Sequence, residues 1–270
     1  MAVAEVTYRR IEVPDPLRGV VEHVWVLHQP AGRGETEVLL PDGRGLVLLT
    51  AGAAGLLVDP LTGERRPEEP ELRGPWTHAL VRTQTGPGVR LGLQLHPLGP
   101  ARLRGGRPIA DRALPLADVV GPVADDASRL LAAGAEDDAA RLLLDALARQ
   151  PIERSADLDR LDDVVARVDQ ERGLVRPVDL ARFAGVQLAE LHRWCVALLG
   201  MAPAAYLSAV RFSSYVRERV GAGPVRLEAA VAALRWFMDP AYPAREVERF
   251  TGLAPADLRR LVERLRRPTP

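Results

Sequence analysis

The chain lacks lysine and asparagine and contains a single cysteine, Cys195, among its 270 residues. One cysteine excludes a disulfide within the chain, and sparing use of cysteine is typical of a reducing compartment. We therefore expect a cytoplasmic protein in which Cys195 is a buried structural thiol. All 36 basic residues are arginines, as a GC-rich genome would produce, so arginine abundance alone does not indicate binding to nucleic acid.

Long apolar runs are also missing, and this absence excludes further classes of protein. No apolar segment follows a basic start at the N-terminus, so we expect no secretory signal. No stretch is long and apolar enough to span a bilayer, so we expect no membrane association through a helix. Phosphate-binding loops, dinucleotide fingerprints, nucleophile elbows and zinc-protease motifs are absent as well. The sequence thus predicts a protein that is not an enzyme and carries no cofactor or metal.

What is present divides the chain into two parts of different composition. The formal net charge is zero, but arginines outnumber acidic residues after Glu171, so the preceding part is acidic. Gln150 and Pro151 interrupt a helical pattern, because proline cannot continue a helix. We expect a β-rich domain with C-terminal helices over residues 1–151 and a helical domain over residues 152–270.

The first part contains short segments of alternating hydrophobicity separated by turn residues. In residues 20–28, Val21, His23, Trp25 and Leu27 share one face. Glycine-rich turns lie between several of the segments, and such spacing is typical of antiparallel sheets. The further segments lie at residues 38–40, 46–50, 56–59, 78–84 and 89–96. With helices expected from residue 114 onwards, the fold class is α+β, beginning with a cupin-like antiparallel barrel or sandwich.

The second part reads as helices throughout. Ser155 is a suitable N-cap for a helix with a stripe of Leu158, Leu161, Val165 and Val168. Glycines or prolines separate the helices that follow. Those helices are expected at residues 178–184, 188–199, 203–220, 227–237, 241–251 and 255–266.

A helix-turn-helix is expected at residues 180–199. A tight turn at Gly185 joins a short helix to a second one, the arrangement in which the second helix enters the major groove of DNA. On that second helix we expect Leu191 to face the core together with Trp194 or Cys195. Ala189, Glu190, His192 and Arg193 form the expected exposed set, and of these we expect Ala189, His192 and Arg193 to contact DNA.

A near-repeat follows each of two helical stretches. The sequence is GMAPAA at residues 200–205 and GLAPAD at residues 252–257. Each copy opens a new helix, so one small helical unit has been used twice.

These motifs together resemble the AraC/XylS family of transcription regulators. The resemblance rests on Leu180, Gly185, Leu191 and Arg193 and on the repeat, and it extends over residues 158–266. It implies two helix-turn-helix units joined by a long helix over residues 203–220 and binding to double-stranded DNA. Residues 21–25, 40–43, 94–99 and 114–116 resemble a companion domain of some such regulators, which implies a small-molecule effector and a homodimer.

The second unit departs from the family pattern. Trp236 and Phe237 stand where a Gly-Tyr pair is usual. Pro243 would disrupt a helix interior, so we expect the second recognition helix to begin near it. Arg245 and Arg249 would then lie one turn apart and contact DNA phosphates.

The strands of the first part also carry a candidate ligand site. We expect six polar and aromatic side chains to converge at the mouth of the barrel. They are His23, Trp25, Trp76, His78, Gln94 and His96. Three histidines allow a metal site, and with it an enzyme on a cupin-like barrel, but they lack close ligand spacing, so ordinary hydrogen-bonded histidines are favoured.

The function that the sequence favours is a DNA-binding transcription regulator controlled by a ligand or partner at its first domain. The alternative is a module that binds small molecules or proteins and whose degenerate helix-turn-helix no longer binds DNA. Glu246 and Glu248, beside the candidate phosphate-binding arginines, motivate that alternative.

Overall fold

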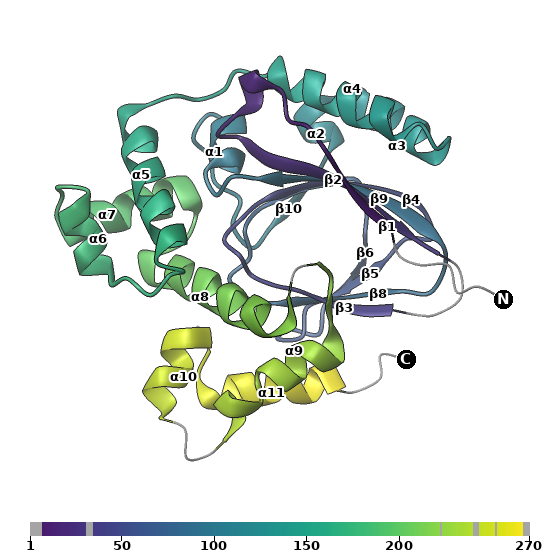
Figure 1. The fold of residues 1–270 in the computed structure, drawn as a ribbon. Coiled ribbons are helices and arrows are strands. Elements are labelled where there is room, and N and C mark those ends of the chain that lie inside the picture. Colours follow the sequence, from purple (N-terminus) through teal and green to yellow (C-terminus); the bar gives the residue numbers. More distant parts are fainter. Residues whose placement is uncertain (1–6, 31–34, 222, 240–242, 252, 267–270) are drawn as a thin grey trace.

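A computed structural model describes residues 7–30, 35–221, 223–239, 243–251 and 253–266. Two antiparallel sheets face each other and form a barrel, and helices pack around the barrel and extend beyond it (Figure 1). The predicted α+β class, with a β domain followed by a helical part, is confirmed.

The two sheets are built from eleven described strands. One sheet has the order β1-β2-β9-β4-β7-β10, and the other has the order β11-β3-β8-β5-β6. The strands are β1 (Thr7–Ile11), β2 (Val21–Gln29), β3 (Glu35–Leu39), β4 (Leu46–Gly52), β5 (Leu56–Val58), β6 (Arg65–Pro67), β7 (Glu71–Arg73), β8 (Leu80–Gln84), β9 (Gly88–Leu95), β10 (Ala113–Pro115) and β11 (Val225–Arg226).

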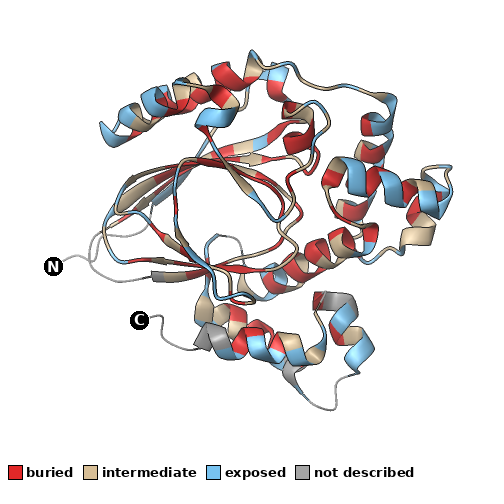
Figure 2. Ribbon diagram, turned by 180° about the vertical axis from the view of Figure 1, so that it is seen from behind, coloured by how far each residue is buried: buried red, intermediate tan, exposed pale blue. Residues whose placement is uncertain are grey.

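The first sheet buries its apolar residues on its outer face. Val24, Val26, Leu91 and Leu93 belong to one core cluster with the leucines and alanines of α3 (Val123–Ala132) and α4 (Glu136–Ala148). Figure 2 shows the buried sides of these two helices turned toward the sheet. Because successive side chains of a strand point to opposite faces, the residues between these valines and leucines point into the barrel.

The remaining helices connect or follow the strands. A 3-10 helix at Asp15–Leu17 and the short helices α1 (Gly99–Leu103) and α2 (Ala117–Val120) belong to the barrel half. The helical half consists of α5 (Ala156–Gln170), α6 (Pro177–Phe183), α7 (Leu188–Trp194), α8 (Pro203–Val220), α9 (Leu227–Ala233), α10 (Ala244–Thr251) and α11 (Pro255–Arg266). Ser155 caps α5 as expected, because its hydroxyl accepts a hydrogen bond from the Leu158 N–H at 3.3 Å.

Two further hydrophobic clusters cross the boundary expected at Pro151. The cluster around α5, α6, α7 and α8 includes Leu98, which precedes α1 in the barrel half. The cluster around α8, α9, α10 and α11 includes Val38 of β3 and Val81 of β8. In addition, β11 follows α8 in the sequence and extends the second sheet by pairing with β3. The two halves therefore share apolar cores.

Among the described residues, no single helix is long and apolar enough to cross a membrane. The segments Leu188–Leu199 and Pro203–Val220, bent by 65° relative to each other, pass the same length and hydropathy criteria only as a pair.

Candidate nucleic-acid interface and effector cavity

The predicted first helix-turn-helix is present as α6, a short turn and α7. Pro177 lies in the first turn of α6, where its missing N–H leaves no helical hydrogen bond unmade. The chain reverses at Gly185, whose φ of +68° is in the left-handed region. α7 then begins at Leu188, and a π-helical segment, Cys195–Leu199, continues it. The turn glycine was thus the informative residue of this motif.

One side of α7 is buried and the other is open to solvent. Leu191, Trp194 and Cys195 are buried in the cluster with α5 and α8, as expected. Burial raises the pKa of the Cys195 thiol to about 12, so this residue is a structural thiol. The exposed positions are Leu188, Ala189, His192, Arg193, Val196 and Ala197. The three residues predicted to contact DNA from this helix are therefore accessible, while Glu190 is half-buried.

Charged side chains around α7 are largely held by other charges. Arg176 and Arg182 both bind Asp179 on α6, at 2.6 Å and 3.2 Å. The hydrogen bond from Arg176 lowers the pKa of Asp179. Arg160 of α5 lies over the ring of Trp194, 5.9 Å from its centre. Arg193 and His192 take part in none of these interactions.

The long helix α8 is fixed to α5 by a buried arginine. Arg211 donates a hydrogen bond of 2.7 Å from Nη1 to the carbonyl oxygen of Gly173, just beyond the end of α5. Gly173 has a φ of +72°, and a Cβ there would lie 2.6 Å from the Leu207 carbonyl oxygen. The α5–α8 contact therefore requires glycine at this position.

The second unit has the same layout as the first. α10 begins at Ala244, directly after Pro243, and the Glu246 and Val247 N–H groups donate to the Pro243 carbonyl oxygen at 2.9 Å and 3.1 Å. The expected start of this helix is confirmed. Pro255 begins α11 as Pro203 begins α8, and both prolines lie at helix starts.

Of the two arginines predicted to contact DNA from α10, the structure describes the side chain of only one. Arg245 is exposed, whereas the side chain of Arg249 lies outside the described residues. Val247 is buried in the cluster shared with the second sheet, so α10 packs against the molecule with the face opposite Arg245. Thr251 closes the helix by donating to the Val247 carbonyl oxygen at 2.8 Å.

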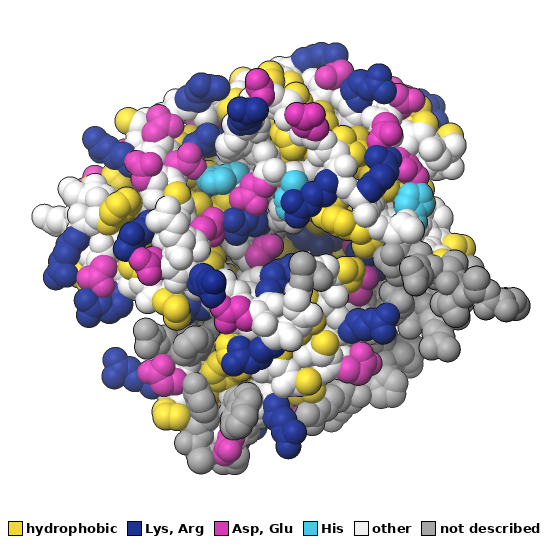
Figure 3. All heavy atoms as spheres, in the orientation of Figure 1, with side chains coloured by type: hydrophobic (Ala, Val, Ile, Leu, Met, Phe, Trp, Pro, Cys, Tyr) yellow, Lys and Arg dark blue, Asp and Glu magenta, His cyan; other side chains and the backbone are white. Residues whose placement is uncertain are grey.

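The surface of the helical half is electrically mixed. In the view of Figure 3, arginine and acidic side chains alternate over the visible surface, with apolar side chains between them. Both candidate recognition helices, α7 and α10, lie on the side of the molecule away from the barrel (Figure 1). A partner bound there would meet separate cationic residues and not a uniformly basic face.

The inside of the barrel is lined by charged side chains. Arg82 on β8 is fully buried and binds Glu68 at 2.6 Å. Arg90 on β9 binds Glu37 on β3 at 3.1 Å and so joins the two sheets. Removing one partner from such a buried pair leaves an uncompensated charge, which costs several kcal/mol. The barrel therefore has an ionic interior and apolar outer faces.

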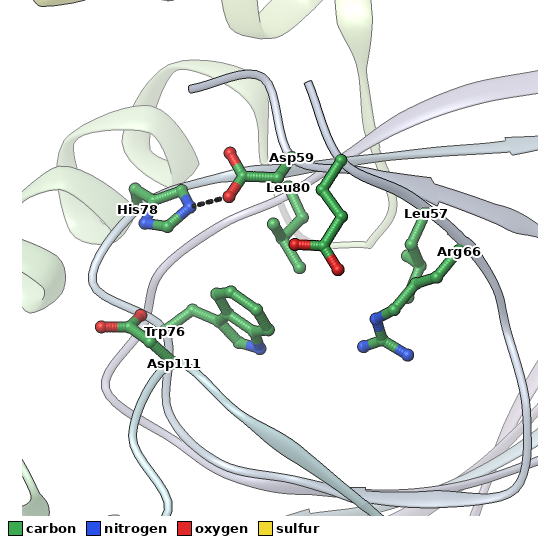
Figure 4. A pocket seen from close by; sticks show the side chains of 8 residues that line it. Leu57, Asp59, Arg66, Trp76, His78, Leu80 and Asp111 are labelled. Carbon is green, nitrogen blue, oxygen red and sulfur yellow. Dashed lines mark hydrogen bonds and ion pairs between the residues drawn. The ribbon is translucent and has the colours of Figure 1, made fainter. Parts of the chain in front are cut away.

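A cavity of about 200 Å³ opens beside this ionic interior. Its lining residues are Leu57, Asp59, Glu64, Arg66, Trp76, His78, Leu80 and Asp111. Figure 4 shows the Trp76 indole and the Arg66 guanidinium facing the same open space. Asp59 binds Nε2 of His78 at 3.1 Å. Burial raises the pKa of the Asp59 carboxyl, but backbone hydrogen bonds from Leu61 and Thr62 together with the contact to His78 leave the pKa lowered.

Two groups in this cavity have unused hydrogen-bonding capacity among the described residues. Nε1 of Trp76 is buried and has no hydrogen-bond partner there. The Glu64 carboxylate forms no hydrogen bond or ion pair with the described part of the chain. Arg66 is engaged, because Nη1 binds Oε2 of Glu71 at 2.5 Å. The cavity thus offers one free donor and one free acceptor.

Only two of the six predicted ligand residues line this cavity, so the expectation of one convergent set is corrected. Trp76 and His78 do so. His23 and Gln94 are cross-strand neighbours on β2 and β9, in the opposite sheet. The physical reason is that alternation along a strand predicts a face but not which part of the barrel that face reaches.

The other two predicted residues have contacts of their own. Trp25 covers Gly92, where a Cβ would collide with the indole, and Arg90 lies 5.9 Å above its ring. His96 leaves the barrel altogether and binds Asp162 of α5 at 3.3 Å. It therefore belongs to the contact between the two halves.

Most of the cavity and network residues were missed by sequence reasoning. The signal that could have found them is a charge in the middle of a short apolar strand. Glu37 precedes Val38, and Arg82 follows Val81, so each charge points to the face opposite a core valine. Charges at such positions indicate a polar interior.

Metal binding finds no support in the geometry of the described residues. In that part of the chain, no group of three or more His, Cys, Asp or Glu side chains is arranged to hold a metal ion. His78 is held by Asp59 and His96 lies against Asp162 of α5, so these two histidines are placed by different elements.

The barrel also touches the first unit through charged side chains around α5. Arg44, in the loop before β4, binds Glu22 and Asp169 at 2.7 Å each. Asp162 lies 3.3 Å from Nε2 of His96 and 3.4 Å from Nη2 of Arg102. Each of these acidic residues on α5 thus faces a cationic or titratable group of the barrel.

The same loop before β4 makes a close backbone contact with α8. Gly43 has a φ of +75°, and a Cβ there would collide with the ring of Tyr206. The Tyr206 hydroxyl is buried without a hydrogen-bond partner in the described region, and burial raises its pKa. The loop resembling the companion domain is therefore a contact between the two halves.

Comparisons with known proteins give distant matches. No family model matches the chain, and no curated protein matches it significantly. ToxT from Vibrio cholerae, solved at 1.65 Å, matches with 10% identity and a TM-score of 0.39, over 88% of this chain and 97% of that one. ToxT bound to (E)-4-(8-methylnaphthalen-1-yl)but-3-enoic acid matches with 9% identity and a TM-score of 0.37, over 89% of this chain and 97% of that one.

A further match is the AraC-like transcriptional activator CuxR, with 12% identity and a TM-score of 0.30, over 71% of this chain and 88% of that one. TM-scores and identities this low describe only distant similarity. The function is therefore inferred from the geometry of this chain.

Proposed function

We propose that this protein is a DNA-binding transcription regulator. The observation that carries the proposal is the duplicated unit: α7 and α10 each expose one face, each follows another short helix, and each precedes a helix begun by proline. Residues on the second helix of such a unit contact base edges and phosphates. We assign base contacts to Ala189, His192 and Arg193 and phosphate contacts to Arg245 and Arg249.

To test this, the full chain is used to select binding sites from random duplex DNA. The selected duplex is then titrated with the protein to measure the dissociation constant. We expect salt-dependent binding, because phosphate contacts release counterions. Arg193→Ala should weaken binding to the selected site by roughly 5- to 150-fold, the range for one good base contact of about 1–3 kcal/mol. Arg129→Ala is the matched control, because Arg129 is exposed on α3 and paired with Asp126. Absence of binding even at low salt would contradict the proposal.

We further propose that the cavity beside the ionic interior is the effector site. Its lining contains Asp59, Glu64 and Asp111 against Arg66, which Glu71 already neutralises. The free Glu64 carboxylate and the indole of Trp76 favour a small organic cation, because a cation is attracted both to a carboxylate and to an aromatic face. This refines the predicted ligand site to Trp76 and His78 among the residues first named.

A ligand panel of one size and three charges tests the effector site. Benzylamine should raise the melting temperature of the protein, while benzyl alcohol and benzoate should have little effect. Glu64→Gln should abolish the benzylamine shift without changing the melting temperature of the free protein, because Glu64 is exposed and forms no ion pair in the described structure. A larger shift with benzoate than with benzylamine would show that the class of ligand is wrong.

The alternative function, an interaction module without DNA binding, is favoured by one observation. Phe183, Leu188 and Val196 are exposed around the first unit, where they could bind a protein partner.

We propose that residues 1–151 form a sensory domain and residues 152–270 a DNA-binding domain. We also propose that two copies of the chain form a homodimer through residues 1–151. Mass photometry of the full chain with and without selected DNA separates these arrangements.

A further inference from the structure

The solvent-exposed face of α7 and of the π-helical segment that continues it is largely apolar. Leu188 is 47% exposed and Val196 is 45% exposed. Ala189 and Ala197 lie beside them and are exposed as well. Single exposed apolar residues are ordinary, but a row of them along one helix face indicates a binding surface.

Packing within the chain does not account for this row. The face that α7 turns to α5 and α8 is filled by Leu191, Trp194 and Leu199. Leu188 and Val196 remain uncovered after the first unit has assembled. These two side chains can therefore become buried only when a partner binds this face.

The charges on the face indicate the partner. His192 and Arg193 lie between the apolar positions, so the face combines methyl groups with hydrogen-bond donors. The major groove presents the complementary set, because thymine carries a methyl group and guanine carries two acceptors. The negative phosphates of DNA also match the cationic centre of the face.

We propose that α7 and its π-helical continuation read thymine methyl groups, with Leu188 and Val196 as the specificity-determining residues. This rests on the DNA-binding function proposed above. The two residues are eight positions apart, so they lie about 12 Å apart along a helix that rises about 1.5 Å per residue. With about 3.4 Å per base pair, the two thymines are three to four base pairs apart, and Arg193 faces a pair between them.

Deoxyuridine provides the test, because it differs from thymidine only by the methyl group. Every thymine of the selected site is replaced singly by deoxyuridine, and the dissociation constant of the full chain is measured for each duplex. We expect roughly fourfold weaker binding at two positions, since burying one methyl-sized group contributes about 0.8 kcal/mol. The two positions should be about three to four base pairs apart.

Substitutions on the helix assign each methyl group to a residue. Val196→Thr keeps the shape of the side chain, and Leu188→Asn removes its apolar surface; neither residue is in the core. At one of the two positions, each variant should bind the duplex with thymidine and the duplex with deoxyuridine with equal affinity. Leu174→Asn is the matched control, because Leu174 is 48% exposed and lies between α5 and α6, outside α7.

The possible failures are distinguishable. If no duplex binds even at low salt, the proposed function fails. If a site is selected but deoxyuridine changes binding nowhere, DNA binding stands and thymine reading is wrong. If Leu188→Asn converts a dimer to a monomer without altering discrimination, the face is an interface between copies, and the proposal is overturned.

Discussion

The two helical units share a layout but are attached to the barrel in different ways. The first unit meets it through α5, where Arg44 binds Asp169 and His96 lies 3.3 Å from Asp162, and through Leu98, which belongs to the apolar cluster of that unit. The second unit is continuous with the barrel, because β11 pairs with β3 and the cluster of α9, α10 and α11 contains Val81 of β8. Both units thus share apolar residues with the barrel, but the first unit adds charged contacts, whose strength depends on pH and salt.

This difference suggests how a change in the barrel reaches each unit. Three residues of the cavity lining, Leu57, Arg66 and Leu80, lie on β5, β6 and β8 of the sheet that carries the second unit, and the other lining residues lie outside these strands. A ligand that shifts these strands acts on the second unit through packed side chains. The first unit is reached through the loop before β4 and through α5. If the cavity is the effector site proposed above, the second unit is the one more directly coupled to it.

The largest expected effect comes from a cavity in the shared core. Leu258→Ala removes a fully buried side chain of α11, and we expect the free energy of unfolding to fall by about 2–5 kcal/mol. Because the cluster includes strand residues, hydrogen–deuterium exchange should increase in β3 and β8 as well as in the helices. Leu188→Ala, at an exposed position, is the control and should change stability by less than about 0.5 kcal/mol. Faster exchange confined to α11 would show that the second unit is not joined to the barrel.

The next effect concerns the ionic contact of the first unit. Arg44→Gln leaves Glu22 and Asp169 without their shared partner, and we expect a loss of about 1–3 kcal/mol, as for hydrogen bonds to charged groups. Exchange should rise in α5 more than in α9. Arg172→Gln, which breaks an exposed pair with Glu218, is the control. Equal exchange in both units after Arg44→Gln would remove the distinction between them.

The two units should also differ in the kind of DNA contact they make. Arg245→Ala should weaken binding about equally for all sequences and lower the salt slope by roughly one, as expected for one phosphate contact. Arg193→Ala should instead relax the preference at one base pair of the selected site. Anisotropy titrations at several salt concentrations measure both. A sequence-specific loss with Arg245→Ala would mean that both units read bases.

The smallest expected effect is a pH dependence of stability that arises at the contact between the barrel and α5. Burial lowers the pKa of His96, and the positive charges of Arg102 and Arg44 act in the same direction, although Asp162 opposes them. The folded state therefore favours the neutral imidazole. Stability is complete above the ordinary histidine pKa and falls as the pH drops below about 6.5.

Substituting His96 isolates its contribution to the pH dependence of stability from those of the other titratable groups. His96→Gln should flatten the dependence between pH 7 and pH 5 by a fraction of a kcal/mol to about 1 kcal/mol, measured by urea unfolding. His23, whose pKa burial also lowers, lies in the barrel, so His23→Gln is the matched comparison. If only His23→Gln flattens the curve, the α5 contact is not the pH-dependent one.

Much of the fold was predictable because local signals agreed with the tertiary structure. The turn at Gly185, the repeated proline starts of α8 and α11, and the alternation in β2 each specify backbone conformation directly. The start of α10 followed from the constraint that Pro243 imposes on a helix. These are properties of a few adjacent residues.

The candidate ligand site was less predictable, since it depends on which strands meet. Trp76 and His78 were expected to converge with four other residues, but those lie on the other sheet or bind α5. Arg66 and Glu71 are close in sequence, yet their role follows only from the position of the cavity. Register and sheet order are long-range properties that no short window contains.

The sequence by itself determined the order of elements, the turn chemistry and the exposed side of α7, because each depends on neighbouring residues and their periodicity. Only the tertiary structure decided that the barrel is ionic inside, that a cavity lies beside Trp76, and that β11 joins the second unit to β3. The physical reason is that burial of charge and sharing of apolar cores are settled by contacts between segments far apart in the chain.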